Sequence, residues 1–226
     1  MPARYAGTVL LIAFDTSTPA VTVALHDGSA VLAEWTEVGV NRQGELLTPG
    51  IQQVLSMAGA KPRDLSHVVA GTGPGPFTGL RVGLVTARAL GHALDIPVHG
   101  VCSLDAVALL HNDCRDLVVM TDARRREVYW ARYVDGLRSV GPSVDRPGDL
   151  AAGLSGAALA GAGALLYRET FAGHDLTGDH PYPEASALAV IGAAQIAAGT
   201  AGPADPLYLR RPDAVPPAPR KQVTPV

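Results

Sequence analysis

Residues 71–91 read GTGPGPFTGLRVGLVTARALG, and this stretch decides the fold. The apolar run from His67 to Ala70 precedes it, and a segment with helical spacing follows its first few residues. Glycines and prolines alternate from Gly73 to Pro76, so the loop combines positions that tolerate unusual backbone angles with positions whose φ is fixed. The sequence therefore predicts a strand, a rigid turn and a helix, with Thr78 as the N-cap residue.

A stripe of small residues runs along one face of this predicted helix. Gly79, Gly83, Ala87 and Gly91 recur at every fourth position. A glycine inside a helix costs up to about 1 kcal/mol relative to alanine, so close packing should compensate for it. Two alternatives remain at this point: the helix packs tightly on its own sheet, or the stripe contacts a helix of another chain.

The elements on either side of this stretch indicate a mixed sheet. Three short strands joined by tight turns come first, followed by a helix from Glu45 to Ala58 whose apolar face includes Leu47 and Ile51. After the glycine loop and its helix, a strand around Ile96 to Val101 leads into a short helix capped by Ser103. Hairpin strands followed by alternating strands and helices are typical of an α/β fold with helices on the faces of the sheet.

The second half of the chain partly repeats this pattern. Two predicted strands flank a charged turn at Asp122 to Arg126, and a helix is predicted from Ala185 to Ala198. Residues 212–226 contain five prolines and almost no apolar periodicity, which is typical of an extended or disordered tail. We predict a first lobe at 1–103, a second lobe at 104–211 and a proline-rich tail at 212–226.

Bulk composition excludes several classes of protein. The net charge of −3 over 226 residues gives no electrostatic footprint for nucleic acid, so direct RNA binding by this chain alone is disfavoured. Two cysteines are too few for a disulfide framework. The first apolar run, Val9 to Phe14, is too short for a signal peptide or a membrane span. The expectation is a soluble, cytoplasmic protein that does not contact a membrane.

Catalytic and metal-binding motifs are missing from the sequence. The seven histidines include no pair at i,i+4, so no metal site of the zinc-peptidase kind is expected. No Gly-x-Ser-x-Gly elbow occurs, and neither lysine follows a glycine loop in the P-loop manner. We therefore predict no catalytic residue and no metal ligand in this chain.

Four motifs, in order along the chain, resemble those of the bacterial TsaB family. The resemblance covers about Val9 to Tyr133, with a weaker echo at Leu207 to Arg211. The motifs are Asp15-Thr-Ser-Thr18, Gly73-Pro-Gly-Pro-Phe-Thr-Gly-Leu-Arg-Val-Gly83, Ile96-Pro-Val-His-Gly100 with Ser103-Leu104, and Asp122-Ala-Arg-Arg-Arg-Glu-Val-Tyr-Trp130. The glycine loop with its Phe-Thr-Gly-Leu-Arg continuation is the most specific of them.

The resemblance implies both a fold and a function. TsaB proteins have the two-lobed fold of actin and sugar kinases, with a mixed sheet and flanking helices in each lobe. They are non-catalytic paralogues and partners of the TsaD transferase, which makes threonylcarbamoyladenosine beside the anticodon of certain tRNAs. The implied partners are a TsaD-like transferase and a TsaE-like ATPase, with a homodimer when the chain is alone and tRNA contacted only through the complex. No cofactor is expected, except ATP or ADP at the interface with the partner.

The resemblance to the family favours the second alternative for the small-residue stripe, a contact with a helix of another chain. In the family, helices of the first lobe pack against the equivalent helices of TsaD or of a second TsaB. We therefore expect Gly79, Gly83, Ala87 and Gly91 to form the partner interface, together with Leu47 and Ile51 of the preceding helix. On this reading, Gly83→Leu abolishes partner binding and leaves the fold intact.

The turn Asp15-Thr16-Ser17 has two interpretations. In kinases and ATPases of this fold the corresponding turn binds phosphate, and here it would be a vestigial phosphate site. The alternative, which we favour, is a turn closed by Asp and Ser/Thr side chains that bond their own backbone, because the turn lacks glycine and ends at Pro19. Gln43 stands where the family commonly has a histidine, which removes the basis for a metal or proton role there.

Two further questions stay open at the level of the sequence. The run Arg124 to Arg126 reads first as a solvated hairpin turn and second as a contact for tRNA phosphate or an acidic partner. Two other functional classes are a small-molecule kinase of the same superfold, which needs phosphate loops in both lobes, and a glycoprotease, which needs the missing histidine pair.

Overall fold

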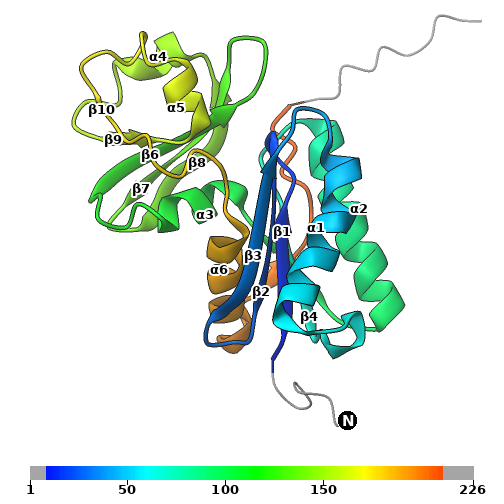
Figure 1. Cartoon of the computed structure of the whole chain (residues 1–226). Coiled ribbons are helices and arrows are strands. Elements are labelled where there is room, and N and C mark those ends of the chain that lie inside the picture. Colours follow the sequence, from blue (N-terminus) through cyan, green and yellow to red (C-terminus); the bar gives the residue numbers. More distant parts are fainter. Residues whose placement is uncertain (1–8, 211–226) are drawn as a thin grey trace, which may run out of the picture.

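The computed structural model describes residues 9–210 and folds them into two lobes, each built around one mixed sheet (Figure 1). The first sheet has the strand order β11-β5-β4-β1-β2-β3, and the second has the order β10-β9-β6-β7-β8. The strands of the first sheet are β1 (Leu11–Asp15), β2 (Ala20–His26), β3 (Val31–Val38), β4 (His67–Gly71), β5 (Val98–Val101) and β11 (Gly202–Pro203). The predicted two-lobed α/β architecture is confirmed, while the proline-rich tail lies outside the described residues.

The central strand of the first sheet explains the long apolar run near the start of the sequence. β1 pairs with β2 in antiparallel register and with β4 in parallel register, so it has a neighbour on both edges. Ile12 and Phe14 pack on one face of the sheet, whereas Leu11 and Ala13 pack on the other. A strand that is covered on both faces requires apolar residues at every position, which is why no alternation appears.

Helices cover both faces of this sheet (Figure 1). On one face lie α1 (Gln43–Ala58) and α2 (Phe77–Leu94), and on the other lies α6 (Ala185–Ala197). Helix α1 begins two residues before the predicted start. Gly59 follows its last residue as the C-cap and has a left-handed backbone conformation. Helix α2 begins at Phe77 with Pro76 as its N-cap residue, so the prediction of Thr78 in that role is wrong.

The chain division predicted at residue 103 differs from the observed lobes. Helix α6 packs on β1 and β2, and β11 pairs with β5, so residues 185–203 return to the first lobe. Helix α3 (Ser103–Leu109) bridges the two units, because it packs on both α6 and β6. The apolar face of the first sheet needs a cover, and the alanine-rich α6 provides it from a distant part of the chain.

The second lobe is smaller and is built from residues between α3 and α6. Its strands are β6 (Asp116–Asp122), β7 (Val128–Val134), β8 (Leu137–Asp145), β9 (Ala158–Ala160) and β10 (Asp175–Leu176). The short helices α4 (Pro147–Ala151) and α5 (Ala162–Leu166) cover it, with Phe171 buried between them and the sheet. No helix within residues 9–210 is long and apolar enough to cross a membrane.

Two stacked histidines should make the stability of the first lobe depend on pH. His67 of β4 and His99 of β5 lie with ring centroids 5.4 Å apart. Burial lowers the pKa of both rings, and the charge of His99 lowers the pKa of His67 further. The unfolded chain therefore binds more protons just below the ordinary pKa of 6.5, and stability falls as the pH drops through that value.

We expect the double variant His67→Gln/His99→Gln to lose less stability than the wild type between about pH 7.5 and about pH 5.5, measured as urea midpoints. Burial lowers the pKa of His26 as well, so His26 adds an acid-dependent loss of stability in both proteins. The contribution of His67 and His99 is therefore the difference in that loss between the wild type and the double variant. His92→Gln, which changes an exposed ring on α2, is the control. If the double variant and the wild type lost the same stability on acidification, the pH dependence could not be assigned to His67 and His99.

Candidate functional site

The turn after β1 is closed by its own side chains. The amide and the hydroxyl of Ser17 both donate to Asp15 Oδ1, each at 2.7 Å, and Ser103 Oγ donates to Asp15 Oδ2. Burial raises the pKa of Asp15, while these hydrogen bonds act in the opposite direction. The carboxylate lies where a Cβ of residue 71 would be, so Gly71 is required at the end of β4. These contacts are the ones expected for a turn that is closed by its own Asp and Ser side chains.

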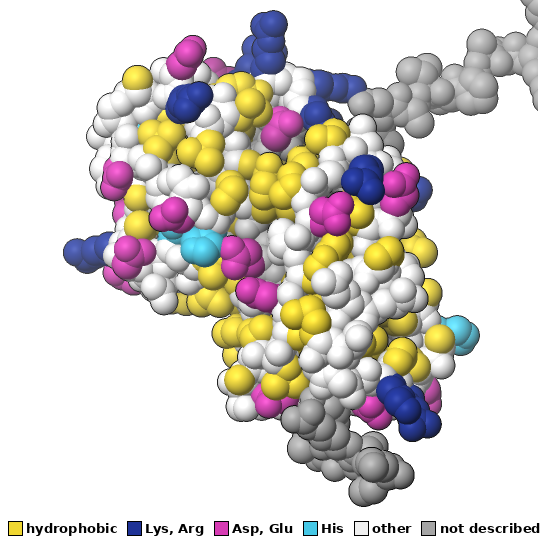
Figure 2. Space-filling model, viewed as in Figure 1, with side chains coloured by type: hydrophobic (Ala, Val, Ile, Leu, Met, Phe, Trp, Pro, Cys, Tyr) yellow, Lys and Arg dark blue, Asp and Glu magenta, His cyan; other side chains and the backbone are white. Residues whose placement is uncertain are grey.

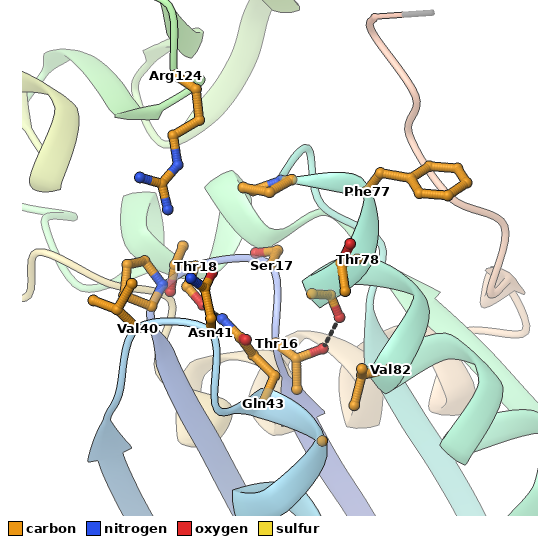
Figure 3. A pocket seen from close by; sticks show the side chains of 14 residues that line it. Thr16, Ser17, Thr18, Val40, Asn41, Gln43, Phe77, Thr78, Val82 and Arg124 are labelled. Atoms are coloured by element: carbon orange, nitrogen blue, oxygen red, sulfur yellow. Dashed lines mark hydrogen bonds between the residues drawn. The ribbon is translucent and has the colours of Figure 1, made fainter. Parts of the chain in front are cut away.

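Thr16 connects the same turn to helix α2. Its hydroxyl donates to the carbonyl of Gly79 at 2.7 Å (Figure 3). The same hydroxyl accepts from the amide of Gly83 at 3.0 Å. A side chain can reach the backbone of a helix only where that helix has no side chain of its own in the way. A Cβ on Gly83 would lie 2.6 Å from Thr16 Oγ1, so the glycine makes this contact feasible.

The small-residue stripe therefore packs within the chain, and the expected partner interface must be corrected. Gly79, Gly83, Ala87 and Gly91 are buried against the first sheet and its turns, with Gly91 over Val98. Leu47 and Ile51 are also buried, in the core beneath α1. Because these six positions are buried in the single chain, a second chain that docks on these two helices would contact mainly their opposite faces.

The glycine loop is held to the turn from the other side. The amide of Gly73 donates to Ser103 Oγ at 3.0 Å, and the same hydroxyl donates to Asp15. Gly73 has a φ of 85°, which is a conformation that glycine adopts without strain. Ser103 thus joins the turn, the loop and the start of α3, although its sequence position suggested only a helix cap.

A cleft between the lobes opens directly beside these elements. Its volume is about 660 Å³, and it lies between the turn after β1, the starts of α1 and α2, and the hairpin that joins β6 to β7. Gln43 Nε2 donates to the carbonyl of Thr18 at 3.0 Å, so this residue ties the start of α1 to the turn. Figure 3 shows Arg124 extending from the second lobe toward Thr18 and Asn41.

The arginine hairpin has an unusual backbone. Arg124, Arg125 and Arg126 are exposed and have φ values of 62°, 54° and 60°, all in the left-handed region that side chains disfavour. The amide of Arg124 donates to Asp122 Oδ1 at 2.8 Å, which helps to hold this conformation. Two smaller cavities, of about 180 and 170 Å³, lie next to the cleft, and Arg124 lines both of them.

The outward faces of α1 and α2 carry exposed apolar residues. Val85 is 62% exposed and Met57 is 59% exposed. Near the start of α2, the Phe77 ring lies 4.0 Å from the Arg81 guanidinium and 5.2 Å from the Tyr208 ring, measured to centroids. Figure 2 shows hydrophobic side chains in several places on the side of the molecule formed by these helices.

Two observations in the described part of the chain concern the thiol of Cys102 and the possible metal ligands. Burial raises the pKa of the Cys102 thiol to about 12, so the thiol stays protonated near neutral pH and is a poor nucleophile. Within residues 9–210, no group of three or more His, Cys, Asp or Glu side chains is placed to hold a metal ion.

Sequence comparisons find relatives along most of the chain. A family model described as TsaD, tRNA N6-adenosine threonylcarbamoyltransferase, matches residues 40–193. An uncharacterized protein of Mycobacterium tuberculosis is 48% identical over 209 residues, which are 91% of this chain and 94% of that protein. The tRNA threonylcarbamoyladenosine biosynthesis protein TsaB of Escherichia coli is 33% identical over 126 residues, and that segment is 54% of each chain. The Bacillus subtilis TsaB is 33% identical over 124 residues, again 54% of each chain.

Solved structures match over a larger part of the chain. YeaZ from Pseudomonas aeruginosa superposes with a TM-score of 0.76 at 29% sequence identity, covering 89% of this chain and all of that one, 100%. A second crystal structure from the same organism, described as similar to the peptidase YeaZ, gives a TM-score of 0.78 at 29% identity and the same coverage. The likeness therefore includes both lobes.

Proposed function

Because this chain belongs to the TsaB family, we propose that it is a non-catalytic subunit that binds and activates a TsaD-like transferase in the threonylcarbamoyladenosine modification of tRNA. A role in this tRNA modification follows from the TsaB relatives, and a TsaD-type partner is supported by the match to the TsaD model. The observation that carries the proposal is the similarity to TsaB proteins in the first half of the chain, combined with the match of both lobes to YeaZ.

The contacts of the first turn favour a supporting role over a kinase. A kinase of this fold needs free donors in that turn to hold phosphate. Here the Ser17 amide and hydroxyl are bonded to Asp15, and the Thr16 hydroxyl is bonded to α2. Donors that are already paired inside the chain can bind phosphate only if these buried contacts break.

The proposal assigns the docking face to the outward sides of α1 and α2. Val85 lies near the middle of α2 on that side, and apolar residues exposed there would be buried by the transferase. In the isolated protein a second copy would cover the same face and form a homodimer. A TsaE-like ATPase joins the assembly, and tRNA is contacted only through the complex, in the cytoplasm. The proposal assigns no cofactor to the chain itself, and the one place it leaves for ATP or ADP is the interface with the partner.

Reconstitution with the host's transferase and ATPase tests the function. We expect tRNA threonylcarbamoylation to fall to background when this chain is omitted, and to return when it is added back. The chain by itself should neither modify tRNA nor consume ATP with sugars or other small hydroxylated substrates. Full activity without this chain would refute the subunit role, and ATP-dependent phosphorylation of a small molecule by the chain alone would favour the kinase.

A further inference from the structure

We propose that the groove between the arginine hairpin and the Tyr208 ring is a contact for an unpaired nucleotide of the tRNA substrate. In this contact the base stacks on the exposed face of Tyr208, and the RNA backbone lies against Arg124 and Arg125. The inference rests on the proposed function, because that function brings tRNA to the complex that contains this chain. It concerns the smaller groove of about 170 Å³ beside the hairpin and not the cleft between the lobes.

Two exposed aromatic rings form one side of this groove. Phe77 and Tyr208 both line it, with ring centroids 5.2 Å apart, and they are 36% and 43% exposed. Figure 3 shows the Phe77 ring directed away from the side chains of the cleft, toward the last described residues. Aromatic side chains that keep a face open to solvent are the surfaces on which proteins stack the bases of single-stranded nucleic acids.

The size of the groove favours a single ring of a larger partner. Pockets that enclose whole small molecules begin at about 300 Å³, and the groove is smaller than that. A nucleobase presents one flat ring system, and an unpaired base is free to turn out of its own strand and stack on a protein side chain. The groove therefore fits one base of an RNA rather than a free metabolite.

The opposite side of the groove is positively charged. Arg124 and Arg125 line it from the second lobe, and both are exposed. The acids of the same hairpin do not cancel this charge, because Arg124 Nε lies 3.8 Å from Asp122 Oδ2 and Glu127 is already paired with Arg210. Arginines beside an aromatic platform are the combination by which proteins hold the phosphates and the bases of one strand together.

The backbone of the hairpin holds arginines where glycine would fit more easily. Arg124, Arg125 and Arg126 all have left-handed φ values, which glycine adopts without strain and other residues disfavour. Unfavourable backbone angles occur most often at sites of binding or catalysis, where the side chain compensates for them by its contacts. Three exposed arginines in succession on such a backbone are consistent with a contact to a polyanion.

The position of the groove explains why RNA binding would need the whole complex. The chain has a net charge of −3, so one cationic groove gives it little affinity for RNA when it is alone. The hairpin joins β6 to β7 in the second lobe, whereas the proposed docking face lies on α1 and α2 in the first. The transferase and the tRNA can therefore bind to this chain at the same time.

The charge contribution is tested in the reconstituted complex with an unmodified, fluorescently labelled tRNA transcript. We expect Arg124→Gln/Arg125→Gln to weaken tRNA binding by about tenfold at about 0.1 M salt, measured by anisotropy. The slope of log affinity against log salt should become less steep by about 1.4, since each phosphate contact to a single strand contributes about 0.7.

Lys61→Gln/Arg63→Gln is the matched control for this variant. It removes two exposed positive charges just before β4, whereas the glycine loop beside the groove follows the other end of that strand. We expect the control to change the tRNA affinity by less than about twofold and to leave the salt slope within about 0.3 of the wild-type value.

Two substitutions of Tyr208 test the stacking contribution. We expect Tyr208→Ala to weaken tRNA binding by about fivefold or more, with the salt slope unchanged, because the residue contributes a ring and no charge. Tyr208→Phe keeps the ring and should keep the wild-type affinity. Equal loss in both variants would show that the ring itself is not the contact and would overturn the stacking assignment.

The remaining outcomes separate this inference from the subunit role. An unchanged salt slope in Arg124→Gln/Arg125→Gln, or equal loss in the lysine and arginine control, would overturn the inference. A loss of affinity for the transferase or the ATPase, with tRNA affinity unchanged, would make the hairpin a protein contact and would overturn it as well. Failure of the complex to assemble would refute the subunit role and the inference with it. An assembled, active complex whose tRNA affinity is insensitive to these variants would refute the inference alone.

Discussion

Gly83→Leu is expected to destabilise the protein by about 3 kcal/mol or more, which is a large part of the stability of an ordinary domain. The new side chain would begin 2.6 Å from Thr16 Oγ1, in a buried space that the threonine already fills. Either Thr16 is displaced and its two hydrogen bonds to α2 are lost, or the helix shifts away from the sheet. Urea unfolding followed by circular dichroism measures the change.

This result replaces the expectation that Gly83→Leu leaves the fold intact. Gly44→Ala is the matched control, because Gly44 lies in α1 and a Cβ there meets nothing within 4 Å. That variant should be as stable as the wild type, or more stable by up to about 1 kcal/mol, since alanine is the better helix former. A wild-type urea midpoint for Gly83→Leu would contradict the packing described for Thr16.

Val85→Glu is expected to abolish binding to the TsaD-like transferase while leaving the chain folded. Val85 is 62% exposed in the single chain, so a glutamate there should change the free energy of unfolding by no more than about 0.5 kcal/mol. At the proposed docking face, however, the same carboxylate would be buried without a counter-charge, which costs several kcal/mol. The affinity should therefore fall by about a hundredfold or more.

Calorimetric titration of the transferase, alongside the reconstituted tRNA assay, measures the effect. Leu137→Glu is the control, because Leu137 is 76% exposed on β8 of the second lobe, away from α1 and α2. Wild-type affinity for Val85→Glu would exclude the outward side of α2 from the interface. Equal loss in both variants would indicate a general effect of added charge and would also refute the assignment.

The two variants on α2 separate folding from docking. Gly83 and Val85 are two residues apart, and a helix places such neighbours on different sides. Gly83 faces the turn after β1, whereas Val85 faces outward. We expect Gly83→Leu to lower the urea midpoint. We expect Val85→Glu to keep the wild-type midpoint and to weaken only the affinity for the partner.

Much of the fold could be predicted from the sequence because local patterns depend on local geometry. The apolar run that forms β1, the hairpin strands after it, and the glycine loop that leads into α2 all follow from residue spacing and from the backbone preferences of glycine and proline. The closed turn at Asp15 was also the favoured interpretation, since Asp and Ser side chains bond nearby amides.

Only the tertiary structure decided which partners those elements meet. The stripe of small residues in α2 has the same spacing whether it faces a sheet or another chain, and the contact that explains it comes from Thr16, 67 residues before Gly83. Ser103 bonds to Asp15 across 88 residues, and Thr22 bonds to the carbonyl of Pro183 across 161. No local pattern encodes such pairs, because strand order and the cover of an apolar face depend on the whole chain. The return of α6 to the first sheet and the position of Arg124 over the start of α2 have the same origin.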